Sequence, residues 1–192
     1  SLPTVKPNAP QNSFENLQVL SITHPALINY LEERCIGIEI ARTVCKELHF
    51  DTRGKHYFGI GFPNIAGGYE IRNPFFKGGI TPKDISLFHN EESKQSCFVF
   101  EGFIDFLSFM MLRRKENDGL KRQDYLVLNS VSNVHKALES LSHYKNVQCF
   151  LDNDEAGRNA YKQLSEELGS SVLDSSSLYS DFKDLNDYLC AE

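Results

Sequence analysis

The chain lacks the residue spacings that mark several common catalytic and metal sites. Its six histidines include no His-Glu-x-x-His segment, and neither a Gly-x-Ser-x-Gly elbow nor a P-loop occurs. The sequence therefore gives no support for a zinc protease, a serine hydrolase of that type or a P-loop NTPase. A Cys-x-x-Cys pair is also absent, which argues against a zinc ribbon and a disulfide framework. The five cysteines are Cys35, Cys45, Cys97, Cys149 and Cys190.

Long hydrophobic runs are absent as well. No apolar stretch approaches the roughly 20 residues needed to span a bilayer. The N-terminus has no basic region followed by an apolar one, so we expect no signal peptide. These absences predict a cytoplasmic protein with reduced cysteines and no membrane partner. Because the chain begins with Ser rather than Met, we expect it to be a fragment.

The charge is unevenly distributed along the 192 residues, which are 41% hydrophobic and carry a net charge of −6. Residues 1–95 hold ten basic and ten acidic side chains, whereas residues 96–192 hold ten basic and sixteen acidic ones. The net charge argues against a simple nucleic-acid coat protein. The acidic excess is consistent with a metal site or with solvated helix faces.

The distribution of prolines and of apolar residues divides the chain into an arm and two parts. Residues 1–20 are predicted to be a linker or arm, because their first sixteen positions hold three prolines and little apolar periodicity. Residues 21–95 predict a small mixed α/β subdomain, with helices beginning near residue 23 and over 38–48, then short antiparallel strands between 52 and 83. Residues 96–192 alternate strand and helix, which predicts a mainly parallel four-stranded sheet flanked by helices. The expected strands are 97–101, 125–129, 147–152 and 171–174, and the expected helices are 105–114, 134–141, 156–168 and 185–190.

Carboxylates follow two of these predicted strands. Glu101 follows one apolar run, and Asp152 and Asp154 follow another. Because ligands of open α/β sheets collect at the carboxyl ends of the strands, we expect the three side chains to share one crevice. They would repel one another unless a divalent ion lay between them, which predicts a Mg²⁺ or Mn²⁺ site. In the alternative interpretation, Asp154 caps the following helix and Asp152 only ends its strand.

These segments resemble the Toprim domain. Glu101 and Asp105 stand in its Glu-Gly-x-x-Asp pattern, and Asp152 and Asp154 stand in its Asp-x-Asp pattern. The stretch 154–160 resembles the continuation of that motif in DnaG-type primases, and 30–36 and 82–89 are similar to further segments of that catalytic core. The resemblance implies that Glu101 is a metal ligand or a general acid/base, with Asp105 either a helper or a helix cap. It also implies that Asp184, in the segment 181–187, caps the last helix or adds an outer carboxylate.

A basic and aromatic stretch lies between residues 52 and 83, where five basic residues accompany a single acid, Glu70. Basic side chains can follow a phosphate backbone while aromatic rings stack on unpaired bases. Alternatively, most of these rings form the core of the subdomain. The resemblance makes Arg72, Lys77 and Lys83 candidates for contacting template, nucleotide triphosphate or nascent primer. Arg158 and Lys183, near the acidic motifs, are candidates for holding triphosphate oxygens, and Asn129 and Ser130 are expected to border the site.

Taken together, the resemblance implies a DnaG-like primase core from a plasmid or mobile element, acting in DNA replication. Such an enzyme condenses nucleoside triphosphates into short RNA primers on a single-stranded DNA template, using Mg²⁺ or Mn²⁺, with a replicative helicase as a candidate partner. Primases of this family also carry a zinc-binding module and a helicase-interacting module, and neither is evident in this sequence. Two alternatives stay open: a metal-dependent Toprim nuclease, and a non-catalytic DNA-binding module with a Toprim fold.

Overall fold

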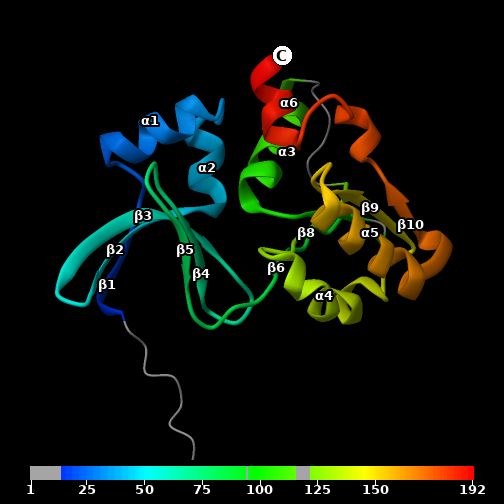
Figure 1. The fold of residues 1–192 in the computed structure, drawn as a ribbon, viewed down its shortest axis with the longest axis horizontal. Coiled ribbons are helices and arrows are strands. Elements are labelled where there is room, and N and C mark those ends of the chain that lie inside the picture. The colour runs from blue at the N-terminus through cyan, green and yellow to red at the C-terminus, as the bar shows by residue number, and fades with distance from the viewer. Residues whose placement is uncertain (1–13, 94, 116–121) are drawn as a thin grey trace, which may run out of the picture.

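Two five-stranded sheets organise the computed structural model, which describes residues 14–93, 95–115 and 122–192 (Figure 1). The first sheet is an antiparallel meander in the order β1-β2-β3-β4-β5. Its strands are β1 (Glu15–Leu20), β2 (Lys46–Thr52), β3 (Lys55–Pro63), β4 (Tyr69–Arg72) and β5 (Lys77–Ile80). Helices α1 (Pro25–Glu33) and α2 (Ile38–Val44) connect β1 to β2.

Two predictions for this region are wrong. The arm predicted over 1–20 contains β1, which pairs with β2, while residues 1–13 lie outside the described residues. All six side chains of β1 are exposed, so the strand has no apolar face that a sequence pattern could reveal. The helix predicted over 38–48 ends at Val44, because the following residues pair with both β1 and β3 as β2. Pairing on two sides outweighs local helix propensity here.

The second sheet has the order β10-β9-β7-β8-β6. Strands β7 (Ser96–Phe100), β8 (Asp124–Val127), β9 (Asn146–Phe150) and β10 (Val172–Asp174) are parallel, as predicted. A fifth strand, β6 (Ser86–Phe88), pairs antiparallel with β8 and lies before residue 96, where the second part was predicted to begin. The α/β class and the mainly parallel sheet are therefore confirmed, with one antiparallel edge strand added.

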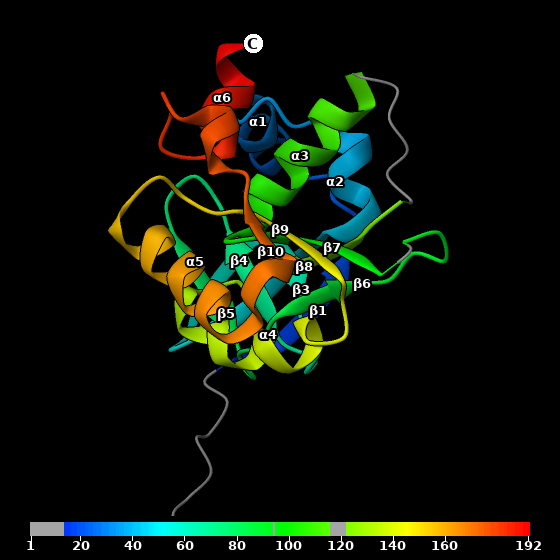
Figure 2. The same ribbon diagram turned by 90° about the vertical axis from the view of Figure 1, so that its right-hand side faces the viewer.

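Helices cover both faces of this second sheet (Figure 2). They are α3 (Phe103–Lys115), α4 (Val134–Leu141), α5 (Glu155–Leu168) and α6 (Leu185–Ala191), with 3₁₀ turns at Val131–Asn133, Gly169–Ser171 and Ser176–Tyr179. Successive side chains of a strand point to opposite faces. Accordingly, Phe98 and Phe100 of β7 pack in the cluster that contains α3, whereas Cys97 and Val99 pack in the cluster that contains α4 and α5. Within the described ranges, no helix is long and apolar enough to cross a membrane.

Aromatic rings join the two sheets. Phe62 of β3 stacks on Phe103 at the start of α3, with ring centroids 5.1 Å apart and planes inclined by 16°. Phe62 also contacts Phe88 of β6 at 5.7 Å, and Phe88 stacks on Phe106 of α3 at 5.3 Å. Such aromatic pairs each contribute roughly 0.5–1.5 kcal/mol beyond the burial of their surface. One of the hydrophobic clusters thus includes residues from both of the predicted parts.

Candidate active site

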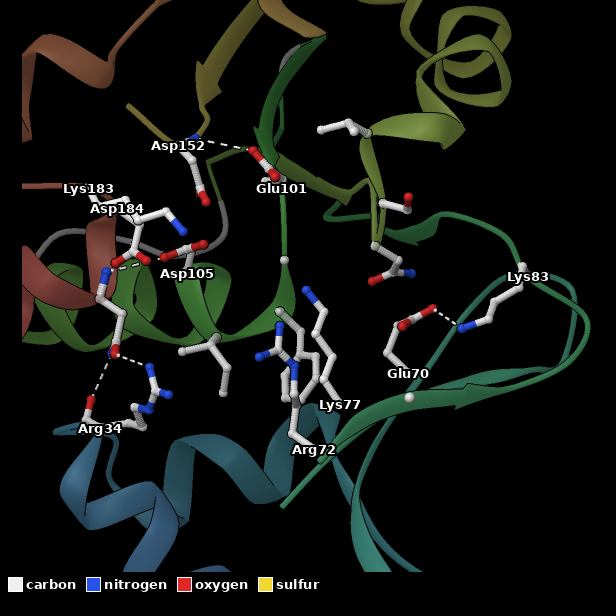
Figure 3. Close-up of a pocket in the computed structure, with 18 residues that line it drawn as sticks. Arg34, Glu70, Arg72, Lys77, Lys83, Glu101, Asp105, Asp152, Lys183 and Asp184 are labelled. Atoms are coloured by element: carbon white, nitrogen blue, oxygen red, sulfur yellow. Dashed lines mark hydrogen bonds and ion pairs between the residues drawn. The ribbon is translucent and has the colours of Figure 1, made fainter. Parts of the chain in front are cut away.

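A pocket of about 680 Å³ lies between the two sheets (Figure 3). Carboxylates from the second sheet and its helices line one side, and basic side chains from β4 and β5 rise toward them from the other. Eight of the ten side chains predicted for the site line this pocket: Arg72, Lys77, Lys83, Glu101, Asp105, Asp152, Lys183 and Asp184.

Glu101 and Asp152 lie at the carboxyl ends of neighbouring parallel strands. Glu101 directly follows β7, and Asp152 comes two residues after the end of β9. The backbone N–H of Asp152 donates to Oε2 of Glu101 at 3.3 Å. Burial raises the pKa of Glu101. Burial, together with the nearby carboxylates of Glu101, Asp184 and Asp154, raises the pKa of Asp152 to about 7.

A glycine brings α5 close to this strand end. A Cβ placed on Gly157 would lie only 2.0 Å from the carbonyl oxygen of Asp152. The first turn of α5 can therefore approach the chain at Asp152 because residue 157 has no side chain.

Asp154 occupies the capping position that the alternative interpretation gave it. Its Oδ1 accepts the backbone N–H of Gly157 at 2.9 Å, which satisfies one of the free donors at the start of α5. Its Oδ2 lies 3.9 Å from Nζ of Lys183. Asp154 is therefore beside the pocket and not in its lining. Among the described residues, no group of three or more Asp, Glu, His or Cys side chains is arranged to hold a metal ion, which differs from the expected three-carboxylate cluster.

Asp105 and Asp184 add two further carboxylates to the pocket lining, and Asp105 is the buried one of the two. Burial raises the pKa of Asp105 well above its ordinary value, and the carboxylates of Asp184 and Asp152 add to that effect. Its Oδ1 accepts the backbone N–H of Asn186 at 3.2 Å. Oδ1 of Asp184 accepts the N–H of Asp187 at 2.8 Å and so caps α6, as expected.

Asn186 and Arg34 are lining residues that were not predicted as part of the site. Asn186 is 2% exposed, and its Nδ2 donates to the carbonyl of Arg34 at 2.8 Å and to Oγ of Ser108 at 2.9 Å. The amide thus joins the start of α6 to α3 and to the end of α1. The similarity of the segment 30–36 to a primase segment could have suggested Arg34 as a site residue. Its contact with Asn186 could not be predicted, because the two residues are 152 positions apart in the sequence.

The basic wall is built at the β4–β5 turn. Arg72 and Lys77 are cross-strand partners, and the Arg72 guanidinium lies 6.0 Å from the centre of the Phe103 ring. Burial lowers the pKa of Lys77, and so does Arg72, while Glu101, Glu70 and Asp152 act in the opposite direction. Nζ of Lys83 pairs with Oε1 of Glu70 at 3.3 Å. Glu70 is the one acid of its stretch, and sequence reasoning assigned it no role in the site.

The remaining predictions concern Asn129, Ser130 and Arg158. Asn129 and Ser130 line the pocket, as expected. Nδ2 of Asn129 donates to the Asp84 carbonyl at 2.9 Å, but its buried Oδ1 has no hydrogen-bond partner among the described residues. Arg158 lies on α5 with an exposed side chain, outside the lining.

The sequence of residues 98–189 matches the family model described as Toprim-like. Residues 98–189 form a Toprim domain. Residues 16–81, which hold most of the first sheet, match a domain of unknown function, DUF8464. No curated protein sequence matches the chain.

Solved primase structures share the fold of the Toprim domain together with the first sheet. The primase fragment of the bacteriophage T7 primase-helicase superposes with a TM-score of 0.62 at 17% identity, covering 100% of this chain and 79% of that one. The structure of T7 lagging-strand DNA polymerase with primase domains bound to an RNA/DNA hybrid and dTTP gives 0.57 at 16% identity, covering 91% and 86%. The zinc-binding and RNA polymerase domains of the Aquifex aeolicus primase give 0.54 at 17% identity, covering 88% and 55%. The chain therefore has a primase-like fold.

The donors of the pocket suit a hard divalent cation. Glu101 and Asp152 offer carboxylate oxygens, and the pKa of Asp152 is raised by burial and by the neighbouring carboxylates, whose negative charge a cation would neutralise. Mg²⁺ commonly takes one or two protein carboxylates and completes its shell with water and substrate phosphates. Two carboxylates facing an open pocket fit that pattern, while Arg72 and Lys77 supply positive charge for a phosphate-bearing substrate.

Proposed function

We propose that this chain is the catalytic core of a primase-type nucleotidyltransferase, which joins ribonucleotides into short primers on single-stranded DNA. The observation that carries the proposal is the opposition, across one pocket, of Glu101 and Asp152 to Arg72 and Lys77. The primase-like fold supports it, since the three solved relatives are all described as primases or as complexes of primase domains.

Glu101 and Asp152 would hold Mg²⁺ or Mn²⁺, with Asp184 as an outer carboxylate. Toprim domains generally bind divalent metal ions. When bound, the ion stabilises the charge that develops on the attacking and leaving oxygens of nucleotidyl transfer. Asp154 serves mainly by capping α5 and by contacting Lys183. Asp105 would position the site indirectly, because its Oδ1 accepts the backbone N–H of Asn186.

The basic side chains would bind the triphosphate and the template backbone. Lys77 and Arg72 face the carboxylates from the other wall, so phosphates held there would lie beside the metal ligands. Lys183 approaches from the acidic side, and Lys83 pairs with Glu70 at the pocket edge. Arg158, on the exposed surface of α5, would contact nucleic acid outside the pocket. In the transfer, the 3′ hydroxyl attacks the α-phosphorus, and pyrophosphate leaves.

A replicative helicase is the partner proposed for this activity. The first T7 relative is a fragment of a primase-helicase protein, so its primase unit works within a chain that also carries a helicase. Priming needs unpaired template, which a helicase produces. Single-stranded DNA and nucleoside triphosphates are the proposed ligands of the pocket itself.

The test is one gel assay with a single-stranded DNA template, labelled ribonucleoside triphosphates and Mn²⁺. It compares the chain with Glu101→Gln and with Glu167→Gln, a matched change on the exposed surface of α5. We expect short new products from the chain and from Glu167→Gln, and at least a hundredfold less from Glu101→Gln.

The same gel separates the alternatives when the template carries a second label. Template shortening that disappears in Glu101→Gln would identify a nuclease instead. If neither products nor shortening appear while DNA still binds, and binding is equal in Glu101→Gln, the chain is a non-catalytic DNA-binding module. Either result would contradict the proposal.

A further inference from the structure

The β2–β3 hairpin of the first sheet (Figure 1) carries a second cluster of ionisable side chains. Asp51 and His56 are cross-strand partners, and His49 is two residues before Asp51 on the same face of β2. Nδ1 of His49 and Nε2 of His56 lie 3.1 Å apart. None of these residues lines the pocket between the sheets.

The outer nitrogen of each imidazole is held by a carboxylate. Nε2 of His49 lies 2.7 Å from Oε1 of Glu47, and Nδ1 of His56 lies 2.9 Å from Oδ1 of Asp51. An ionised carboxylate can only accept, so each outer nitrogen carries the N–H in these bonds. In the neutral rings, the two facing nitrogens then both present lone pairs.

Two lone pairs at 3.1 Å repel each other unless a positive species lies between them. A bridging proton is one such species, and a metal ion is the other. The arrangement in which one ring nitrogen binds metal while the other donates to a carboxylate recurs in metal-ligating histidines. At Zn–N bonds of about 2.0–2.1 Å and a tetrahedral angle, two ligand nitrogens lie about 3.3–3.4 Å apart. An opening of a few tenths of an ångström, available to the 58% exposed His56 side chain, would admit the ion.

The carboxylates are themselves fixed in place. Oε2 of Glu47 accepts the backbone N–H groups of Thr23 and His24, each at 2.8 Å, and the Glu47 side chain is only 5% exposed. Oδ2 of Asp51 accepts from Nδ2 of Asn16 on β1 at 2.8 Å. The orientation of both imidazoles is therefore set before any ligand arrives, which reduces the ordering cost of binding.

We propose that His49 and His56 form a binding site for a divalent transition metal ion that prefers imidazole, namely Zn²⁺, Ni²⁺ or Cu²⁺. Imidazole suits these ions, whereas Mg²⁺ and Mn²⁺ favour the carboxylate oxygens of the pocket. No third His, Cys, Asp or Glu among the described residues is placed to complete the set, so water fills the remaining positions. The proposal is independent of the nucleotidyltransferase proposal, because it uses a different surface and a different class of metal.

The test is a Zn²⁺ titration against a chromophoric chelator, run in excess Mg²⁺ so that the carboxylate pocket does not contribute. It compares the chain with His56→Gln, His49→Gln and the matched control His143→Gln, an exposed histidine in the turn after α4. The exposed thiols Cys35 and Cys190 hydrogen-bond to each other and give the same Zn²⁺ background in every variant. Above that background, we expect one Zn²⁺ equivalent in the chain and in His143→Gln, and at least tenfold weaker binding of that equivalent in each of the other two.

Asp51→Asn separates the proposed site from adventitious binding. It keeps the shape of the side chain but weakens the hold on His56, and loss of such a supporting partner typically lowers metal affinity 10–100-fold. Far-ultraviolet circular dichroism of each variant checks that the sheet is intact. Equal Zn²⁺ titrations of the chain, His49→Gln and His56→Gln, or no bound equivalent in the chain, would overturn the proposal and leave a proton shared by the two rings.

Discussion

The Glu101 carboxylate accepts the backbone N–H of Asp152 at 3.3 Å. This bond ties together the residues that follow two adjacent parallel strands, β7 and β9, so the two acidic side chains are placed by the sheet itself. A position set by a sheet ladder is more rigid than one set by a loop alone. The predictions below concern this pair and the residues that support it.

Metal affinity should depend on pH through Asp152. Because its pKa is raised to about 7, a divalent ion must displace a proton from it below that pH. We expect apparent Mn²⁺ affinity to rise about tenfold between pH 6 and pH 8, with proton release on binding. Calorimetric titration in two buffers of different ionisation enthalpy measures both effects. Asp152→Asn should bind Mn²⁺ weakly and without this slope, and a slope unchanged in that variant would contradict the assignment.

Asp105→Asn should stabilise the fold at neutral pH. The folded pKa of Asp105 is raised, chiefly by burial, so the folded state holds a proton that the unfolded state releases near pH 4. The contribution of Asp105 to stability is therefore fully present at low pH and is lost as pH rises toward its folded pKa. Asparagine stays neutral and can still accept the Asn186 N–H. Urea unfolding at pH 5 and pH 8 should show a gain for Asp105→Asn at pH 8, within the usual range of about 0.5–3 kcal/mol for single substitutions. A loss at pH 8 would show that the carboxylate stabilises the fold.

Gly157→Ala should displace Asp152 from its position in the pocket. An added Cβ would lie 2.0 Å from the Asp152 carbonyl oxygen, so α5 or the strand end must move. We expect a loss of about 1–3 kcal/mol in unfolding free energy, against the gain that alanine normally gives in a helix, together with weaker Mn²⁺ binding. Gly102→Ala, whose Cβ would meet no atom within 4 Å, is the control for the stability measurement, whereas Mn²⁺ binding is compared with the unchanged chain because Gly102 itself lines the pocket. Equal stability of the two variants would mean that the approach of α5 is not tight.

Lys77→Met should weaken nucleotide binding while leaving the fold intact. Methionine keeps the apolar stem of Lys77 but removes the charge that faces Glu101 and Asp152. A hydrogen bond to a charged group contributes about 1.5–3 kcal/mol, so we expect nucleoside triphosphate affinity to fall roughly ten- to a hundredfold. Lys55→Met, at the exposed start of β3, should leave affinity unchanged. Equal losses in both variants would point to a general charge effect, and no loss in either would place the triphosphate elsewhere.

Asn186→Ala should loosen the joint between α1, α3 and α6. The change removes the donor to the Arg34 carbonyl and to Ser108 Oγ in a buried position. Leaving such groups unpaired costs about 1–3 kcal/mol. Thermal unfolding measures the loss, and hydrogen exchange should show it concentrated in α6. The control is Asp187→Ala, a polar-to-alanine change at the exposed next position of the same helix, and an equal loss in both variants would contradict the role of the buried amide.

The sequence predicted the second sheet well because each of its parallel strands is an apolar run followed by a polar break. The proximity of Glu101 and Asp152 was predicted for the same reason, since a carboxylate that follows an apolar run can be recognised from the neighbouring sequence. β1 was missed because all its side chains are exposed and its stability comes from pairing with β2. The contact between Arg34 and Asn186 was missed because it exists only after distant helices have packed.

The placing of Asp154 shows a different limit. Its position two residues after Asp152 predicts a metal ligand, and in the structure its Oδ1 also accepts the Gly157 N–H and caps α5. One carboxylate has an oxygen for each role, so a local sequence pattern predicts both roles equally well.

The stacked rings of Phe62 and Phe103 have a consequence for motion. The stack joins β3, the neighbour of the strand that carries Arg72, to α3, the helix that follows Glu101. Both rings belong to the same hydrophobic cluster. Opening the pocket by swinging the two sheets apart would break that stack and expose several phenylalanines. We therefore expect substrates to enter and leave through rearrangement of long side chains such as Lys77 and Lys83, on the nanosecond scale of rotamer changes, while the walls tumble as one body.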